Sequence, residues 1–452
     1  MQKNEILKLL ADFIAIESVS TDKSRTLAMG QAGEFLARTL THMGFEVTAH
    51  RIADAPPFII GAYRVAGAHE TMGVYGHYDV QPEDPVDAWH SPPFKLTSRD
   101  GKLYGRGVAD DKGHIIQNIV ALQQLIATKK LNKNIVCFFE GEEESGNKHL
   151  NDFLALGEAR ILREPDVWLV TDMGASGSGE PQIWNGLRGI VYFEITIETS
   201  NKDAHSGIYG NRVHNPAQLL CDLFARMKDA HSVVVQIPHF YDNIIFPTPT
   251  EYASLLTQSD SDASLRARSG AHVLPTTWGP FPGAPSDMPL ALTSKLLPSL
   301  DIHGVWGGYI QDGVKTIIPA RANAKFSCRI VAGQKPENVA RLVHDFVCAH
   351  IPPGVSIKLT QKEGSEAFYT AVDNLWTKRI AGALEHTFKT PVRYNRSGGS
   401  IPVAQALQQK FSKPVILTGF TLPDDNIHAP NENYDEQMFW KGIEALELIY
   451  TS

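Results

Sequence analysis

The chain is 452 residues long, with 43% hydrophobic and 20% charged residues, a composition typical of a folded protein with large buried cores. Its formal net charge of −8, and the lack of a basic segment interleaved with aromatic residues, argue against binding to nucleic acids or anionic membranes. No apolar segment reaches the roughly 18 residues that a membrane span needs. The four cysteines are scattered without a C-x-x-C pair, so they are expected to be reduced thiols in a cytoplasmic protein.

The first 185 residues alternate helix-like and strand-like segments, which is typical of an α/β sheet covered by helices. Residues 1–20 have the apolar spacing of an amphipathic helix and lack the cleavage site of a signal peptide. Short apolar runs predict buried strands at 73–76, 135–139 and 166–170. Residues 114–130 predict a helix with one apolar face and lysines at its end.

The pattern changes after residue 186. Alternating apolar residues predict antiparallel strands at 190–199 and within 314–333, and residues 215–230 predict a helix. The segment 235–300 is rich in Pro, Ser, Thr and Asp, which indicates long loops or excursions from the domain. The sequence therefore predicts an inserted α+β domain over residues 187–367.

The α/β pattern returns over residues 368–452. A helix is expected near Leu375–Phe388, a strand at 414–420 and a final helix that ends at Tyr450. Because 452 residues exceed one ordinary core, we expect one domain formed by 1–186 and 368–452, with the other inserted between its parts.

Acidic and histidine residues follow most of the predicted buried strands, where α/β folds form their sites. The residues in question are His77, Asp79, Asp110, Asp111, Glu142, Glu143, Glu144, Asp172 and His428. Each alone fits a turn, a helix cap or a solvated loop. So many acids at one edge of a sheet would repel one another unless cations neutralised them.

A His/Asp/Glu donor set without cysteine suits zinc, manganese or cobalt better than a structural thiolate site. Two ions explain the number of carboxylates economically, because one carboxylate can bridge two ions about 3.5–4 Å apart. The sequence therefore predicts two divalent metal ions per subunit and leaves zinc, manganese and cobalt open.

The ordered motifs "YGHYDVQP", "GRGVADDKG", "FEGEEESG", "GLRG", "DAHSGIYG", "FSCRI", "SGGS" and "HAPNE" span nearly the whole chain. In this order they resemble the co-catalytic zinc peptidases, the family of carnosinase, cytosolic nonspecific dipeptidase, carboxypeptidase G and succinyl-diaminopimelate desuccinylase. The resemblance is nearest to the dipeptidase and carnosinase branch. It implies a mixed α/β sheet flanked by helices, with an inserted smaller α+β domain that acts as a lid and holds a homodimer.

The resemblance also favours zinc over manganese and cobalt, and it implies the ligands. His77, Asp110 and Asp172 would hold one ion, and Asp110, Glu144 and His428 the other, with Asp110 bridging. It further implies a cis peptide bond between Asp110 and Asp111. Asp79 is then expected to fix the tautomer and ring orientation of His77, because the two residues share a strand face.

The same resemblance assigns catalytic and binding roles. Glu143 is expected to be the general base, and Glu142 a solvated residue without a role. His205 would stabilise the oxyanion in the partner subunit's site, although a histidine that caps a turn is the plainer interpretation. Arg329 would bind the substrate carboxylate. The resemblance gives weaker support to substrate contacts by Thr316, Gly399 and Ser400.

The function expected from the resemblance is hydrolysis of dipeptides or short peptides with a free carboxylate, by attack of a water that the metals and a glutamate activate. Met173, Gly174 and Ala175 depart from the Asn-Tyr-Trp run of similar dipeptidases. "HAPNE" resembles deacylases equally well, so an N-acyl-amino-acid deacylase is the alternative. A catalytically inactive metal-binding protein is a remote one, because Glu143 and all the ligand positions are present. A serine hydrolase is disfavoured because no G-x-S-x-G motif occurs.

Overall fold

The computed structural model describes residues 1–258, 261–275, 278–286, 288–399 and 401–452. The chain divides into two compact units. The first unit comprises Met1–Asn185, Thr370–Asn395 and Ile401–Ser452. The second comprises Gly186–Tyr369 and a short segment that begins at Arg396. None of the described helices combines the length and apolar character needed to cross a membrane.

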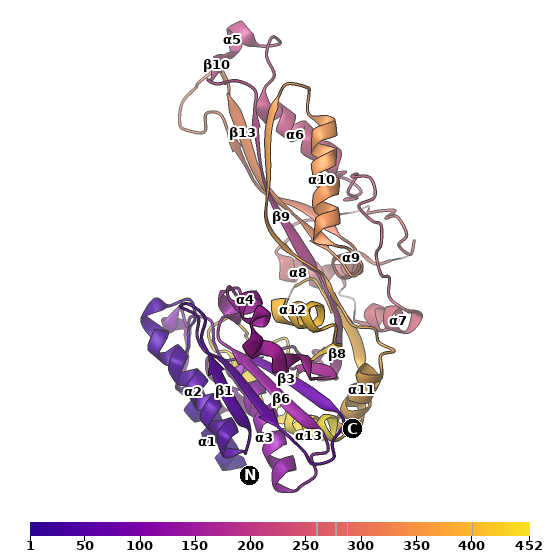
Figure 1. Ribbon diagram of the computed structural model, residues 1–452. Coiled ribbons are helices and arrows are strands. Elements are labelled where there is room, and N and C mark those ends of the chain that lie inside the picture. The colour runs from indigo at the N-terminus through magenta and orange to yellow at the C-terminus, as the bar shows by residue number, and fades with distance from the viewer. Residues whose placement is uncertain (259–260, 276–277, 287, 400) are drawn as a thin grey trace. The chain divides into compact units, whose positions relative to one another are not determined.

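A mixed β-sheet forms the centre of the first unit (Figure 1). Its strands follow the order β1 (Glu46–His50), β2 (Phe58–Tyr63), β6 (Asn134–Glu140), β3 (Thr71–His77), β7 (Val167–Val170), β17 (Val415–Thr418) and β8 (Gln182–Leu187). The short strands β15 (Phe368–Tyr369) and β16 (Arg393–Ser397) pair with β8. The predicted α/β class with a mixed sheet is confirmed.

Four neighbouring strands of this sheet, β6, β3, β7 and β17, are parallel to one another. Every residue of β3, β7 and β17 is buried, as expected for strands covered on both faces. Their carboxyl ends meet at one edge of the sheet. His77 is the last residue of β3, and Glu144, Asp172 and His428 follow β6, β7 and β17, whereas Asp110 follows a strand outside this sheet. The strand order therefore brings together residues that are more than 300 positions apart in the sequence.

Helices cover the sheet of the first unit. They are α1 (Lys3–Ile14), α2 (Thr26–His42), α3 (Lys112–Ala127), α4 (Leu150–Ala155), α11 (Leu375–Phe388), α12 (Pro402–Phe411) and α13 (Glu436–Thr451). The helix α3 packs against α1, α13 and β3, so all its residues from Lys112 to Leu122 are buried. The sequence predicted one buried apolar face for this helix, but in the structure its polar residues are buried as well.

A small antiparallel sheet of three strands lies beside α3. It contains β4 (Thr97–Arg99), β5 (Lys102–Tyr104) and β18 (Asn433–Asp435). In its register Tyr104 pairs with Asn433. The pairing places the loop after β5, which contains Asp110, beside the loop before β18, which contains His428.

The second unit contains a four-stranded antiparallel sheet in the order β11 (Ser299–Gly307), β13 (Arg321–Ile330), β9 (Gly189–Glu198) and β14 (Ser356–Ser365). Residues of β9 alternate strictly between buried and half-buried, so its predicted one-sided burial is confirmed. Helices α6 (Pro216–Met227) and α10 (Pro336–His350) lie along one face of this sheet (Figure 1). A two-stranded pair, β10 (Ala204–His205) with β12 (Ile317–Ile318), and the helical turn α5 (Ser206–Tyr209) complete this part.

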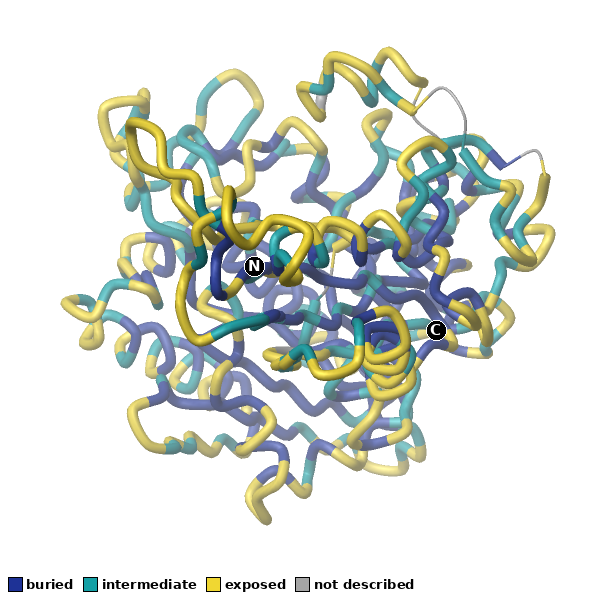
Figure 2. The backbone as a smooth tube through the Cα atoms, turned by 90° about the horizontal axis from the view of Figure 1, so that it is seen from above, coloured by how far each residue is buried: buried dark blue, intermediate teal, exposed yellow. Residues whose placement is uncertain are grey.

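The segment 235–300 is more regular than the sequence indicated. It contains α7 (Pro249–Thr257), α8 (Asp262–Ser269) and α9 (Leu290–Leu296), three helices that the expectation of long loops or excursions did not include. Leu255, Leu292 and Leu296 form a small buried cluster of their own. These helices are short, with at most 9 residues, and such short helices give little periodic signal. Figure 2 shows the distribution of buried and exposed residues along the chain.

Candidate metal centre

Asp110 lies between two histidines of the first unit. Its Oδ1 atom is 2.9 Å from Nε2 of His77, and its Oδ2 atom is 2.9 Å from Nε2 of His428. Each carboxylate oxygen thus faces a different imidazole, which is the arrangement that a bridging ligand requires. The peptide bond between Asp110 and Asp111 is cis, as the family resemblance implied.

Two further carboxylates complete two donor sets. Asp172 Oδ2 lies 3.7 Å from Nε2 of His77, and Glu144 Oε1 lies 3.1 Å from Nε2 of His428. In the described part of the chain, the donor atoms of His77, Asp110 and Asp172 lie within 4.8 Å of one another, and so do those of Asp110, Glu144 and His428. The structure therefore brings all five predicted ligands together in the predicted grouping.

Asp79 is fully buried and touches three of the neighbouring residues. His77 Nδ1 lies 3.1 Å from the Asp79 carbonyl oxygen and 3.4 Å from its Oδ1 atom. The carboxylate also accepts hydrogen bonds from the backbone N–H groups of Glu143, at 3.2 Å, and Glu144, at 3.0 Å. Asp79 thus orients the two glutamates in addition to its predicted contact with His77.

The neighbouring glutamates have different surroundings. Glu144 Oε2 accepts a hydrogen bond from Gln81 at 2.8 Å, which aims its other oxygen at His428. Glu142 is buried and paired with His149 Nδ1 at 2.8 Å, so the expectation that it is solvated was wrong. Its side chain turns away from the ligand cluster because His149, seven residues later, provides both ring and backbone donors.

The charges of this cluster are unbalanced without cations. Burial raises the pKa of Asp172 to about 7, with the negative charge of Asp110 adding to the effect. Burial acts in the same direction on Asp110, but hydrogen bonds from His428 and His77 outweigh it and hold the pKa of Asp110 well below its ordinary value. Hydrogen bonds to Asp110 and then Glu144 raise the pKa of His428 to about 10.

The donor set fits a pair of divalent cations. Glu144 Oε1 is buried and shares the Nε2 atom of His428 with Asp110 Oδ2, so a cation would satisfy an oxygen that half of one imidazole N–H serves poorly. Two imidazoles and three carboxylates without a thiolate match the preferences of zinc, manganese and cobalt. These five residues can therefore hold two ions with Asp110 shared between them.

His205 and Thr316 lie together in the second unit. His205 is exposed, and its Nδ1 atom accepts a hydrogen bond from the N–H of Gly207 at 3.1 Å. The Thr316 carbonyl accepts a hydrogen bond from the N–H of Ser206. The ring therefore caps the short helix α5 through Nδ1 and leaves Nε2 for another partner.

Arg329 lies on β13, opposite Ser299 and Ile190. Its neighbour Arg188 was not predicted as a site residue. The N–H of Arg188 donates to the Gly399 carbonyl at 3.2 Å, and its Nε donates to the Gly398 carbonyl. Burial, and then the charge of Arg329, lower the pKa of Arg188 to about 10.

Two guanidinium groups and the glycine turn thus lie together in the second unit. The motif "GLRG" contains Arg188 and is one of the motifs that carry the family resemblance, but no site role was predicted for its arginine. The predicted substrate contact Ser400 lies outside the described residues.

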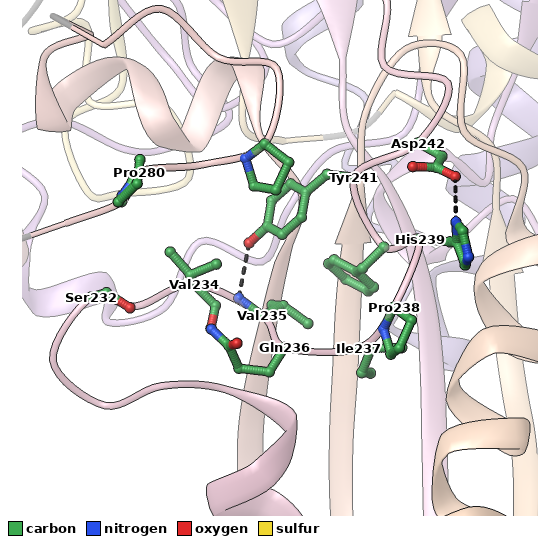
Figure 3. A pocket seen from close by; sticks show the side chains of 13 residues that line it. Ser232, Val234, Val235, Gln236, Ile237, Pro238, His239, Tyr241, Asp242 and Pro280 are labelled. Atoms are coloured by element: carbon green, nitrogen blue, oxygen red, sulfur yellow. Dashed lines mark hydrogen bonds and ion pairs between the residues drawn. The ribbon is translucent and has the colours of Figure 1, made fainter.

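A pocket of about 460 Å³ also lies in the second unit, between residues 232–242 and the prolines near Pro280 (Figure 3). The Tyr241 hydroxyl accepts a hydrogen bond from the N–H of Val235, and His239 pairs with Asp242. No residue of either donor set lines this pocket, nor does Arg329. Its lining combines apolar residues with Ser232, Gln236 and the His239–Asp242 pair.

Comparison with known proteins agrees with the architecture. Residues 73–452 match the model of peptidase family M20/M25/M40. The Cys-Gly metallodipeptidase dug1 of Schizosaccharomyces pombe is 30% identical, over 98% of this chain and 94% of that protein. The human Beta-Ala-His dipeptidase is 27% identical, over 99% of this chain and 89% of that protein.

A solved structure shares the fold along the whole chain. The metallo-carboxypeptidase Sso-CP2 from Sulfolobus solfataricus superimposes with a TM-score of 0.80 at 25% identity, over 100% of this chain and 99% of that one. A mixed α/β sheet that presents two His–carboxylate donor sets at its strand ends is the architecture of a metallopeptidase. The chain belongs to peptidase family M20/M25/M40, and the family predicted from the motifs is confirmed.

The raised pKa of His428 leads to a prediction about metal binding. Because this pKa is about 10 in the metal-free protein, the imidazole is protonated at pH 7 and must lose a proton before it can coordinate a cation. We expect Zn²⁺ binding to release protons. The apparent affinity for Zn²⁺ should fall about tenfold for each unit by which the pH is lowered, for each proton displaced. Calorimetric titrations in buffers of different ionisation enthalpy measure this release.

The variant His428→Gln should release fewer protons on binding Zn²⁺ than the unmodified chain. His149 is a buried histidine outside both donor sets, so the control variant His149→Gln should release as many protons as the unmodified chain. Zn²⁺ binding without proton release at pH 7 would contradict the assignment of His428 as a ligand.

Proposed function

We propose that this metallopeptidase hydrolyses dipeptides or short peptides with a free carboxylate, using two divalent ions, with zinc as the proposed metal. The observation that supports this proposal best is the division of the Asp110 carboxylate between His77 and His428. The relatives named above cleave Cys-Gly and Beta-Ala-His according to their names, so both dipeptides belong in a first substrate panel. N-acyl amino acids belong in the same panel, because their hydrolysis would distinguish a deacylase, the alternative function, from a dipeptidase.

The bound ions would polarise the scissile carbonyl and make water more acidic. His77, Asp110 and Asp172 would hold one ion, and Asp110, Glu144 and His428 the other. The remaining groups of the chain would then orient the substrate and move the proton.

Glu143 is the proposed general base. Its carboxylate is adjacent to Glu144 in sequence, and its backbone is fixed by Asp79. Burial raises the pKa of Glu143 to about 9, and nearby cations would bring it back towards neutrality. A carboxyl group with such proton affinity can accept a proton from the attacking water and donate it to the leaving amine.

Glu143→Gln is expected to retain both ions and to lose turnover by a factor on the order of 10²–10⁴, because only the proton carrier is removed. Metal analysis together with dipeptide hydrolysis measures both quantities. Glu144→Gln is the matched comparison and should lose one ion, whereas Glu142→Gln should retain both ions and most of the activity. Loss of an ion in Glu143→Gln would mean that the roles of the two glutamates are exchanged.

We propose Arg329 as the group that binds the substrate carboxylate, because a planar guanidinium can form two charge-assisted hydrogen bonds with it. The nearby Arg188 adds a second positive charge, and its contact with the carbonyl of Gly399 fixes the glycine turn. Thr316, Gly399 and Ser400 are proposed as additional substrate contacts.

C-terminal amidation of a good dipeptide should lower kcat/KM by roughly 30- to 900-fold, which corresponds to about 2–4 kcal/mol for a lost charge-assisted pair. Arg329→Met should remove most of this preference, and Arg341→Met, at an exposed position of α10, should leave it intact. Equal kcat/KM values for the free and amidated forms in the unmodified enzyme would refute the assignment.

We also propose a homodimer held by the second unit, in which His205 stabilises the oxyanion in the partner subunit's site. The support is the family resemblance together with β11, an edge strand of its sheet that exposes Ile302, Val305 and Trp306. Exposed apolar residues on an edge strand favour association with another chain.

We also propose a cytoplasmic location for the protein. Its four cysteines are free, which supports this proposal, and cell fractionation would test it.

Mixing His205→Ala with Glu143→Gln subunits is expected to restore activity, because each mixed dimer regains one complete site. Random exchange should yield about a quarter of the unmodified activity, from half of the dimers with one of two sites working. A mixture of His239→Ala and Glu143→Gln subunits is the control for effects of mixing alone, because His239 is another exposed histidine of the second unit. No recovery after proven subunit exchange would exclude the action of His205 across the dimer.

A further inference from the structure

Glu432, which follows His428 by four residues, is bonded to the loop that contains Asp110. Its Oε2 atom accepts hydrogen bonds from Arg106 Nη1 at 2.7 Å and from the N–H of Gly107 at 3.0 Å. Its Oε1 atom accepts hydrogen bonds from the N–H groups of Ala109 at 2.9 Å and Asp110 at 3.2 Å. One carboxylate thus receives four hydrogen bonds, and one of the donors is the backbone of Asp110 itself.

Arg106 extends this connection to two other loops. Its Nη2 atom donates to the carbonyl oxygen of Pro82 at 3.0 Å and lies 3.5 Å from that of Ala429. The guanidinium also lies 5.3 Å from the ring of Trp89. Pro82 follows Asp79, and Ala429 follows His428 directly. The side chain therefore contacts loops next to two of the proposed site residues.

The pair is deeply buried, and its surroundings leave little freedom. The side chains of Arg106 and Glu432 are each only 1% exposed. Gly107, between Arg106 and Ala109, has a φ of +85°, and an added Cβ atom would lie 2.7 Å from Val80. The loop can therefore follow the path towards Asp110 only with glycine at this position.

We propose that Arg106 and Glu432 are a positioning pair that holds Asp110 and His428 at bridging distance and thereby sets the affinity of the site for its ions. This inference rests on the metal site proposed above. A bridging carboxylate must be placed to within about half an ångström, and residues on loops reach such precision only through supporting contacts. Both ligands lie on loops. Glu432 accepts a hydrogen bond from the N–H of Asp110, and Arg106 lies 3.5 Å from the carbonyl oxygen of Ala429, the residue after His428.

A purely structural ion pair is the competing explanation, because breaking any buried pair destabilises a protein. Metal affinity distinguishes the two. In Glu432→Gln the amide nitrogen must face two donors, whichever way the side chain is turned, so the loop cannot keep its position. Arg106→Lys retains the charge but cannot reach Glu432, Pro82 and Ala429 together.

The test uses the full-length chain stripped of metal and titrated with Zn²⁺ in competition with a chelator. Both variants are expected to bind Zn²⁺ about 10–100-fold more weakly, as is typical when partners of metal ligands are changed. At saturating Zn²⁺, kcat should recover towards that of the unmodified enzyme, with an unchanged KM for the dipeptide. Ile449→Ala, at a fully buried position of α13, lowers stability without touching the loops and should keep the Zn²⁺ affinity.

Unchanged Zn²⁺ affinity in both variants, together with a lowered melting temperature, would overturn the proposal and make the pair structural. The double variant Arg106→Gln with Glu432→Gln leaves no buried charge, so it tests the same claim if Glu432→Gln does not fold. An unmodified chain that binds no Zn²⁺ would instead refute the metal site itself, which keeps the two failures distinguishable.

Discussion

The division of one carboxylate between two imidazoles is the constraint on which the site depends. Asp110 can face His77 and His428 at once only if its backbone is fixed, because a side chain with free rotation would favour one histidine. The same arrangement concentrates negative charge, since Asp172 and Glu144 complete the two sets. Protonated histidines offset part of this charge in the metal-free chain, and cations would replace those protons. The site is therefore built around a charge that the protein alone does not balance.

The sheet explains how such distant residues meet. The parallel strands β6, β3, β7 and β17 end at one edge, so a ligand placed just after each end needs only a short loop to reach the others. Asp79 makes this edge rigid, because its carboxylate joins the end of β3 to the backbone of Glu143 and Glu144 after β6. The small sheet of β5 and β18 adds the remaining loops. Secondary structure thus provides the proximity, and buried carboxylates provide the final placement.

Much of this could be predicted from the sequence, for identifiable reasons. Apolar strands followed by acidic or histidine residues form a local pattern in the sequence. The pattern made it possible to predict the ligands His77, Asp110, Asp172, Glu144 and His428, and the family motifs implied how they divide into two sets. Contacts between side chains and distant backbone leave no such pattern. Hence the burial of Glu142 against His149, the bonds of Glu432 to the Asp110 loop and the contact of Arg188 with the glycine turn could not be predicted. The short helices in 235–300 escaped because fewer than three turns show little periodicity.

The chemistry and the choice of substrate depend on different parts of the chain. The donor sets and Glu143 belong to the first unit, where burial and the strand ends fix each group, so substitutions there should affect the ions or proton transfer for every substrate. The proposed carboxylate contacts, Arg329 with Arg188 and Gly399, belong to the second unit and involve no predicted ligand. Residues around Arg329 can therefore change while the hydrolytic groups stay constant. This separation explains why the sequence defines the reaction class more sharply than the substrate, and it directs the search for specificity to the second unit.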